Sequence, residues 1–473
     1  MGQKNDILKL ILINSLPLLI VLSLVLNPQS DLMTHLWMKV NPYGLKQHIA
    51  QDMESYQEIL SQQPWHVEVL GNFAELQYEQ EDFSGVVVSL NELDQQTKLN
   101  FSQELLLANA YLKIGNLDHA KSLWRKLSGM EKLTPDNYLQ IFELQKNNGD
   151  WKGAYSTIQL LAKNETQNPD IQYQYAMFQI IFDPKTANDS LLLSLQGRPS
   201  RADRIKNLQS VVNDILKEDN QTFRMVLAGR GLANQGEWLM ASAAFEQVTN
   251  LDPNYAEGWA FYGNALNYLG KNGFPALQTA EKLSPNSKIV RAMLAVYWRN
   301  SGDSLKSLEI LKELVSEDPK EAYWLYETGN SLAKNGDLNQ ALAAFYQAID
   351  LDPKNIFYWK ELANFCLNYS FLVEVDGLNA IRQALILNPD DPEANDIMGM
   401  IYIQMNNYAN AERFLLKANK FAPYSALILF HLGQLYYLQD ENNLAYFYLK
   451  SSVDYSQNDT IKTQALSLLG KLQ

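Results

Sequence analysis

The sequence repeats at intervals of about 34 residues, and this period limits the possible folds more than any other feature. Prolines that close successive units mark it: Pro253, Pro285, Pro319, Pro353, Pro389 and Pro423. Three of the five intervals are identical in length, and the other two carry a small deletion and a small insertion. A period of this length is typical of stacked helical hairpins. The sequence therefore predicts one continuous all-α body over most of its length, rather than several unrelated globular domains.

The unit that ends at Pro353 shows why particular residues recur. Gly329 lets the first helix of the unit approach the second closely. Gly336 ends the first helix, because glycine readily adopts the left-handed conformation that a helix end favours. Phe345 and Ala348 fall on one face of the second helix. Pro353 cannot continue that helix, so the next unit begins there.

Corresponding residues recur in other units: Gly229, Gly236, Ala241, Phe245 and Pro253, and then Gly399, Tyr402, Ala411, Ala418 and Pro423. On these residues the chain resembles tetratricopeptide (TPR) repeat proteins, from about residue 64 to residue 453. The resemblance implies an all-α, right-handed α-solenoid of TPR helical hairpins, here preceded by one transmembrane helix.

The period divides the chain into segments. We expect a short basic tail (1–6), a transmembrane helix (7–26), a juxtamembrane segment with the first helices (27–63), an N-terminal TPR sub-array (64–169), a degenerate helical joint (170–220), a C-terminal TPR sub-array (221–455) and a capping helix (456–473). The period is lost in the joint, where the pattern predicts two helices outside the standard unit. A functional insertion is the alternative interpretation of the joint.

The N-terminal run of apolar residues from Ile7 to Leu26 is about as long as a helix that crosses a bilayer. No small-x-small cleavage pattern follows it, which favours an uncleaved single-pass anchor over a removed signal peptide. Lys4 and Lys9 lie before or early in the run. The positive-inside rule therefore places the N-terminus in the cytoplasm and the TPR array outside it, with a cytoplasmic array as the alternative.

Composition excludes several classes of function. A formal net charge of −14 argues against binding to nucleic acid, which requires clustered lysine and arginine. Cys366 is the only cysteine, so intrachain disulfides and zinc sites with several thiolates are impossible. The five histidines include no pair four residues apart. We therefore expect no catalytic residues, no metal and no cofactor, and we interpret the chain as a non-enzyme.

The TPR resemblance implies that the first helices of successive units line a concave face, where ligands bind. The residues expected on that face are Asn264, Tyr323, Tyr326, Asn330, Phe357, Lys360, Asn364, Asp396, Met400, Phe430, Gln434 and Tyr437. An asparagine amide donates and accepts at once, so repeated asparagines can hold a peptide backbone. Asparagine is also common at this repeat position without any ligand, so a purely structural role is the alternative.

These features lead to two functional hypotheses. The first is a membrane-anchored TPR scaffold or adaptor that binds a peptide or protein segment in its concave groove during assembly of a membrane-associated complex. The second is a structural subunit of a larger membrane complex, held through its convex or edge surfaces. Both hypotheses require other proteins as partners and the lipid bilayer as the contact of residues 7–26.

Overall fold

The computed structural model of the chain describes residues 42–130, 133–198, 201–456 and 459–472. These residues form twenty-five α-helices, α3 to α27, and one π-helical turn, η2, which confirms the predicted all-α solenoid of helical hairpins. Within the same ranges no helix is both long enough and apolar enough to cross a membrane. The predicted transmembrane helix at residues 7–26 lies outside the described residues. The chain divides into two compact units, residues 1–157 and 158–473, which are described separately.

Unit 1 consists of helices joined by short turns. Its elements are α3 (Pro42–Gln62), α4 (Val67–Glu79), α5 (Phe83–Gln96), α6 (Phe101–Lys113), α7 (Leu117–Ser128), α8 (Pro135–Asn147) and the start of α9 (Trp151–Asn164). Side chains fix where these helices begin. At α6, Asn100 Oδ1 accepts from the Gln103 backbone N–H at 3.0 Å, and Gln103 Oε1 accepts from the Asn100 N–H at 3.1 Å. This reciprocal cap satisfies donors that the first helical turn leaves free.

A polar motif occurs twice in unit 1, and its two copies are two repeat periods apart. It consists of Gln77, Asp82, Gly85 and Ser89, and again of Gln145, Asp150, Gly153 and Thr157, each two periods further along the chain. Ser89 Oγ donates to Gln77 Oε1 at 2.7 Å, and Thr157 Oγ1 donates to Gln145 Oε1 at 2.7 Å. A Cβ on either glycine would collide with the aspartate three residues before it. The motif therefore adds polar contacts to the apolar packing that joins the two helices of the hairpin, such as that of Leu70 and Leu90.

Unit 2 opens with the predicted joint, and here one expectation is wrong. The joint holds three helices rather than two: α10 (Pro169–Phe182), α11 (Pro184–Leu193) and α12 (Ala202–Lys217). Only Asp183 separates α10 from α11, because Pro184 occupies the first position of α11, where its missing N–H costs nothing. The loss of the repeat period in this segment left the sequence pattern without a guide to this boundary.

The rest of unit 2 is a series of hairpins. Its elements are α13 (Gln221–Asn234), α14 (Trp238–Leu251), α15 (Ala256–Tyr268), α16 (Phe274–Leu283), α17 (Lys288–Asn300), α18 (Ser304–Glu317), α19 (Ala322–Asn335), α20 (Leu338–Leu351), α21 (Ile356–Asn368), η2 (Val373–Gly377), α22 (Leu378–Leu387), α23 (Pro392–Gln404), α24 (Tyr408–Phe421), α25 (Ala426–Leu438), α26 (Asn442–Tyr455) and α27 (Asp459–Gly470). The last helix, α27, packs against α26 and α25 and lies within the range expected to cap the array.

The backbone repeats the period that the prolines mark. In each regular hairpin, at least one residue of the turn between first and second helix is left-handed, and the turn after α21 has a second one, Leu372. These residues are Glu81, Gly115 and Gly149 in unit 1, and Gly236, Gly270, Gly302, Gly336, Ser370, Asn406 and Asp440 in unit 2. Gly336, with φ of 92°, behaves as the sequence predicts. The longest of these intervals within unit 2, from Ser370 to Asn406, contains η2, whose wider turn absorbs the additional residues.

The two helices approach closely at the glycine of the first helix, as predicted, and the residue that this glycine meets is the aromatic residue of the second helix. A Cβ built on Gly329 would lie 3.1 Å from the ring atoms of Phe345. At the equivalent Gly229, a Cβ would collide with the ring of Phe245. Both phenylalanines are buried. The glycines therefore let a large apolar ring fill the space between the two helices of each hairpin.

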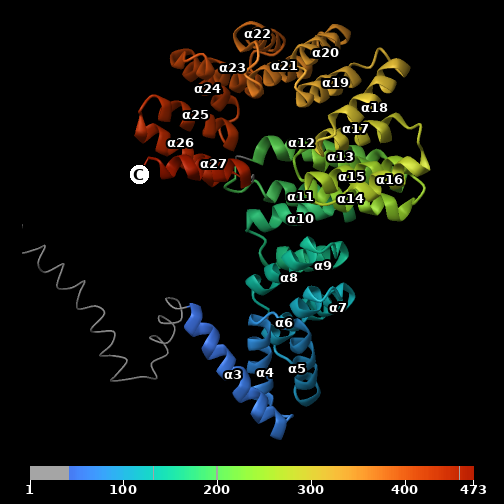
Figure 1. Cartoon of the computed structure of the whole chain (residues 1–473), viewed down its shortest axis with the longest axis vertical. Coiled ribbons are helices and arrows are strands. Elements are labelled where there is room, and N and C mark those ends of the chain that lie inside the picture. The colour runs from blue at the N-terminus through green and yellow to red at the C-terminus, as the bar shows by residue number, and fades with distance from the viewer. Residues whose placement is uncertain (1–41, 131–132, 199–200, 457–458, 473) are drawn as a thin grey trace, which may run out of the picture. The chain divides into compact units, whose positions relative to one another are not determined.

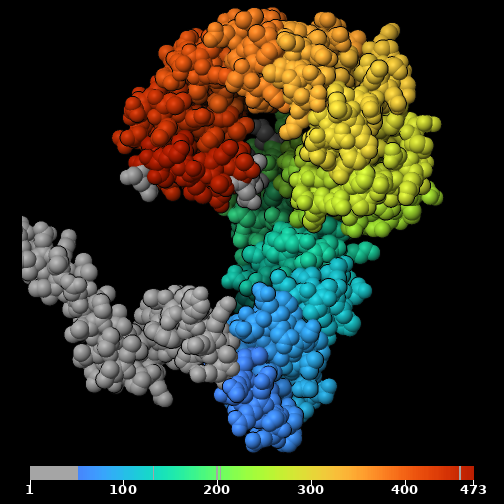
Figure 2. All heavy atoms as spheres, in the orientation of Figure 1, coloured from blue at the N-terminus to red at the C-terminus, as the bar shows by residue number. Residues whose placement is uncertain are grey.

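Contacts between repeats show which helices line the inner face of unit 2. From α15 to α27, each odd-numbered helix contacts the next odd-numbered one, as α19 contacts α21 and α21 contacts α23. Successive second helices of the described residues, such as α18 and α20, are in less contact with one another than successive first helices are. The first helices are therefore closer together and form the concave side. In Figure 1, α19 and α21 lie nearer the inside of the curve than α20 and α22. Figure 2 shows that α17 to α27, coloured yellow to red, curve around a hollow.

Candidate functional site

Every residue expected on the concave face lies on a first helix of unit 2. Asn264 is on α15; Tyr323, Tyr326 and Asn330 are on α19; Phe357, Lys360 and Asn364 are on α21; Asp396 and Met400 are on α23; Phe430, Gln434 and Tyr437 are on α25. The contacts gather ten of these twelve residues at three places: around α19 and α21, around α15 and α17, and around α25 and α27.

The first place is an aromatic cluster that spans two repeats. The ring centroid of Tyr326 lies 5.0 Å from that of Phe357 in an edge-to-face arrangement and 5.8 Å from that of Tyr323. Phe357 is 38% exposed, so one ring of the cluster is open to solvent. Such edge-to-face pairs are favourable because the positive edge of one ring meets the negative face of another.

Glu361 joins this cluster, and it was not among the predicted residues. Tyr326 Oη donates to Glu361 Oε2 at 3.0 Å, which connects α19 to α21. Tyr326 also hydrogen-bonds to Asn330, and Glu361 to Asn364. Glu361, Tyr326 and the two predicted asparagines therefore form one network, to which the exposed ring of Phe357 is adjacent.

Burial sets the electrostatics of Glu361. Removal from water raises the pKa of its carboxyl above the usual range, and the nearby Glu393 carboxylate raises it further. Hydrogen bonds from Tyr326 and Asn364, together with the charge of Lys360, oppose this rise. Within the described part of the chain, no lysine, arginine or histidine forms an ion pair with Glu361. The inner face thus carries a half-buried acid that forms no ion pair among the described residues.

Lys360, which was predicted to face a ligand, is occupied by neighbouring carboxylates. Its Nζ contacts the carboxylate of Glu393 and lies 3.6 Å from Asp391 Oδ1. Both acids belong to the next repeat, so Lys360 connects α21 to the N-terminal end of α23. The side chain is mostly buried between these groups. Lys360 therefore contributes to the stacking of repeats.

Two further links have the same form. Arg299 at the end of α17 contacts the carboxylate of Glu327 on α19, which is only 6% exposed. Burial and the charge of Glu327 raise the pKa of the Tyr323 hydroxyl. Further along, His431 Nδ1 on α25 lies 2.9 Å from both oxygens of Asp396 on α23. Each link ties a first helix to the next first helix.

Of the remaining predicted residues, Met400 packs, partly buried, against an apolar core cluster, and the others line two separate pockets. Phe430, Gln434 and Tyr437 on α25 face Thr463 and Leu468 on α27 across an open pocket of about 470 Å³. Asn264 lines a smaller pocket of about 270 Å³ with Tyr268 of α15 and Tyr297 of α17. These residues do not join the cluster around Tyr326.

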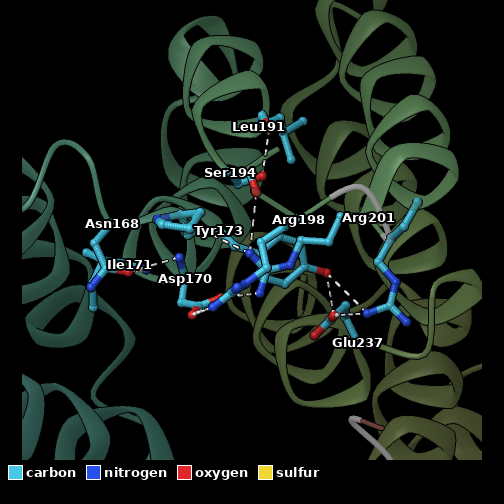
Figure 3. A network of polar contacts seen from close by, with 11 residues as sticks. Asn168, Asp170, Ile171, Tyr173, Leu191, Ser194, Arg198, Arg201 and Glu237 are labelled. Carbon is cyan, nitrogen blue, oxygen red and sulfur yellow. Dashed lines mark hydrogen bonds and ion pairs between the residues drawn. The ribbon is translucent and has the colours of Figure 1, made fainter. Parts of the chain in front are cut away.

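The joint contains a different polar network, shown in Figure 3. Arg198 Nη2 donates to Asp170 Oδ2 at 2.8 Å, and Arg201 contacts the same carboxylate. Hydrogen bonding to Arg198 is the main cause of the lowered pKa of Asp170. Tyr173 Oη donates to Glu237 Oε1 at 2.6 Å, and Arg204 Nη1 donates to the same oxygen at 3.1 Å. The network holds α10 against α12 and α14.

The carboxylates drawn in the joint are paired with guanidinium groups, so this network presents no free acid or base for catalysis. Among the described residues, no group of three or more histidine, cysteine, aspartate or glutamate side chains could hold a metal ion. Cys366 is buried, and burial raises the pKa of its thiol to about 12. A thiol of this kind is unreactive and serves as a small apolar core residue.

Comparison with known families confirms the predicted repeats. Residues 276–356 and residues 392–424 match two family models described as tetratricopeptide repeat. The matched segments run from α16 to the start of α21 and from α23 to α24. They include the α19 half of the aromatic cluster.

Curated relatives cover parts of the chain. It is 22% identical over 284 residues to mitochondrial import receptor subunit TOM70 of Homo sapiens, which is 58% of this chain and 44% of that protein. It is 29% identical over 96 residues to photosystem I assembly protein Ycf3 of Prochlorococcus marinus, 20% of this chain and 56% of that one. An interferon-induced protein with tetratricopeptide repeats from Cricetulus griseus is 26% identical over 155 residues, 32% of each. The chain thus spans between about a third and just over half of the length of these relatives.

Solved structures with similar helical repeats were also found. A tetratricopeptide repeat protein from Parabacteroides merdae aligns with a TM-score of 0.40 at 15% identity, covering 53% of this chain and all of that one. Yeast Tom70 aligns with a TM-score of 0.36 at 16% identity, covering 79% of this chain and 95% of that one.

Proposed function

Because residues 276–356 and 392–424 match tetratricopeptide repeat models, we propose that this chain is a scaffold that holds an extended segment of a partner protein on the concave face of unit 2. One observation carries the proposal. The cluster of Tyr326, Phe357 and Glu361 brings an exposed ring and an unpaired carboxylate together on the first helices of two successive repeats. A core needs neither an exposed ring nor a half-buried acid, whereas a binding surface uses both.

The two asparagines support an extended ligand. Asn330 and Asn364 occupy the same position in successive repeats. Their amides contact Tyr326 and Glu361 respectively, which orients them on the inner face. A side-chain amide that uses one of its groups in such a contact still has others for a peptide N–H or C=O.

The location of this scaffold is part of the proposal. Residues 7–26 would anchor the chain in a membrane, with the array outside the cytoplasm, and the scaffold would serve the assembly of a membrane-associated complex. The length and apolar character of that segment support the anchor. Relatives named as an import receptor subunit and as an assembly protein are consistent with such a role.

Affinity purification from gently solubilised membranes tests the proposal. The wild type is compared with a variant carrying Asn330→Ala, Phe357→Ala and Asn364→Ala. A matched control carries Asn339→Ala, Gln340→Ala and Gln347→Ala, three exposed residues of the second helix α20. We expect specific partners to be lost from the first variant and kept by the control. Partners kept by both variants would contradict binding on the concave face.

One observation favours the second hypothesis, a structural subunit held through its outer surface. Val375 of η2 and Ile386 of α22 are 67% and 70% exposed, although both are large and apolar. Partners in constant stoichiometry that survive the concave-face substitutions, and that are lost on Val375→Ser and Ile386→Ser, would support this function instead.

A further inference from the structure

We propose that Tyr326, Phe357 and Glu361 form a subsite for a cationic side chain, a lysine or an arginine, of the segment that the scaffold holds. The inference rests on the proposed function, because it names the chemistry of the ligand on that face.

Glu361 has no ion-pair partner among the described residues. Other carboxylates facing the inner side near α19 to α23 have a basic partner: Glu327 contacts Arg299, and Asp391 and Glu393 share Lys360. Glu361 receives hydrogen bonds from Tyr326 and Asn364 but forms no ion pair within the described residues. An isolated buried carboxylate costs free energy, and a cation brought to it recovers much of that cost.

The rings of Tyr326 and Phe357 supply the aromatic part of the subsite. The faces of tyrosine and phenylalanine rings attract cations through their quadrupoles, most strongly where water is excluded. The rings of Tyr326 and Phe357 lie 5.0 Å apart and are tilted by 68°, so they form two walls of a corner. Because Tyr326 also donates to Glu361, the carboxylate lies at the edge of this corner. Rings and an acid together are the groups that recognise an ammonium or guanidinium ion.

Acidic side chains outnumber basic ones on the same face. Around the subsite, four acids (Glu327, Glu361, Asp391 and Glu393) face two bases (Arg299 and Lys360). Both bases are occupied by those acids, so neither is available to neutralise an acidic ligand. An anionic segment would therefore be repelled, and a basic segment would be attracted.

Fluorescence anisotropy on the full-length chain in detergent tests this subsite. The probe is a short fluorescein-labelled peptide of alternating lysine and alanine, and its counterpart has glutamine in place of lysine. The key variant is Glu361→Gln, which keeps the size of the side chain. The matched control is Glu374→Gln, which removes one exposed charge from η2, away from the subsite.

We expect the lysine peptide to bind the wild type and the Glu374→Gln control equally, and Glu361→Gln about tenfold more weakly, as for loss of one charge-assisted hydrogen bond. Thermal unfolding of Glu361→Gln checks that the variant folds. In the wild type, protonation of Glu361 should weaken binding of the lysine peptide at acidic pH. Glu361→Gln should not show this weakening.

Three results would overturn the subsite. Equal weakening by both variants would mean that the peptide senses only the overall charge of the chain. Equal binding of the lysine and glutamine peptides would mean a groove without preference for cations, and would leave the proposed function intact. Absence of any binding would exclude the subsite, while membrane purification with the concave-face variant would still decide the proposed function separately.

Discussion

Tyr326 of one repeat donates a hydrogen bond of 3.0 Å to Glu361 of the next, across the inner face of unit 2. The two residues are 35 positions apart in the sequence, one more than the repeat period. The bond therefore joins two different positions of successive repeats. It stabilises the stacking of α19 and α21 and also fixes the carboxylate that we assign to ligand binding.

Removal of the Tyr326 hydroxyl should weaken this stacking. In Tyr326→Phe, Glu361 loses a donor while it remains half-buried, which costs about 1 kcal/mol or somewhat more. Urea unfolding followed by circular dichroism measures the loss. Tyr346→Phe is a poor control, because the Tyr346 hydroxyl contacts Asp376. Tyr446→Phe, at an exposed site on α26, is a better one and should leave stability unchanged.

Stability should depend on pH through Glu361. The folded state raises the pKa of this carboxyl above its ordinary value of 4.5, so the folded chain binds the proton more tightly than the unfolded chain does. This contribution is fully present below the unfolded pKa and is lost as pH rises through the folded pKa. Glu361→Gln lacks it. The stability of Glu361→Gln relative to the wild type should therefore increase as pH rises above the unfolded pKa of about 4.5. A pH-independent difference would contradict the burial of this charge.

The tight glycines should respond unequally to alanine. At Gly229 a Cβ would collide with the ring of Phe245, whereas at Gly329 it would lie 3.1 Å from the ring of Phe345. Alanine gains about 1 kcal/mol of helix propensity at either site. Overpacking of about 1–3 kcal/mol should exceed that gain at Gly229. Thermal melts should therefore show a clear loss for Gly229→Ala and a small change for Gly329→Ala; the reverse order would contradict the packing described.

The polar motif of unit 1 gives a further prediction. In Thr157→Val, the fully buried Gln145 loses the donor to its Oε1, which costs about 1–3 kcal/mol. The double change Thr157→Val with Gln145→Leu removes both partners and should recover part of that loss. Chemical unfolding of both variants provides the comparison. If the double variant lost more free energy of unfolding than the two single variants lose in sum, this would contradict the assigned hydrogen bond.

Features that depend on one repeat alone could be predicted from the sequence. The period follows from prolines and glycines, so the all-α solenoid and the close approach of two helices at Gly329 could be derived. The position of each residue within the repeat unit also placed all twelve expected residues on first helices. These properties are local, because they depend on helix periodicity and on turn geometry.

Contacts between repeats could not be predicted from the sequence. The pairing of Lys360 with Asp391 and Glu393 depends on how far one hairpin is rotated against the next, which the period does not specify. For the same reason Glu361 was missed, although it follows Lys360 directly. The motif of Gln77 and Gln145 could have been found, since its spacing is repeated in full. It is invisible at the single repeat period, because it recurs only two periods further along.

The central claim is that the inner face of unit 2 holds the partner, and site-specific photocrosslinking in native membranes tests it most directly. The photoreactive analogue p-benzoylphenylalanine replaces Phe357 of the inner face or, as the matched control, Phe447 of α26, which is 59% exposed. We predict that a partner protein is crosslinked from position 357 and none from position 447. Crosslinking from position 447 alone would contradict the claim and would assign the partner to the outer surface.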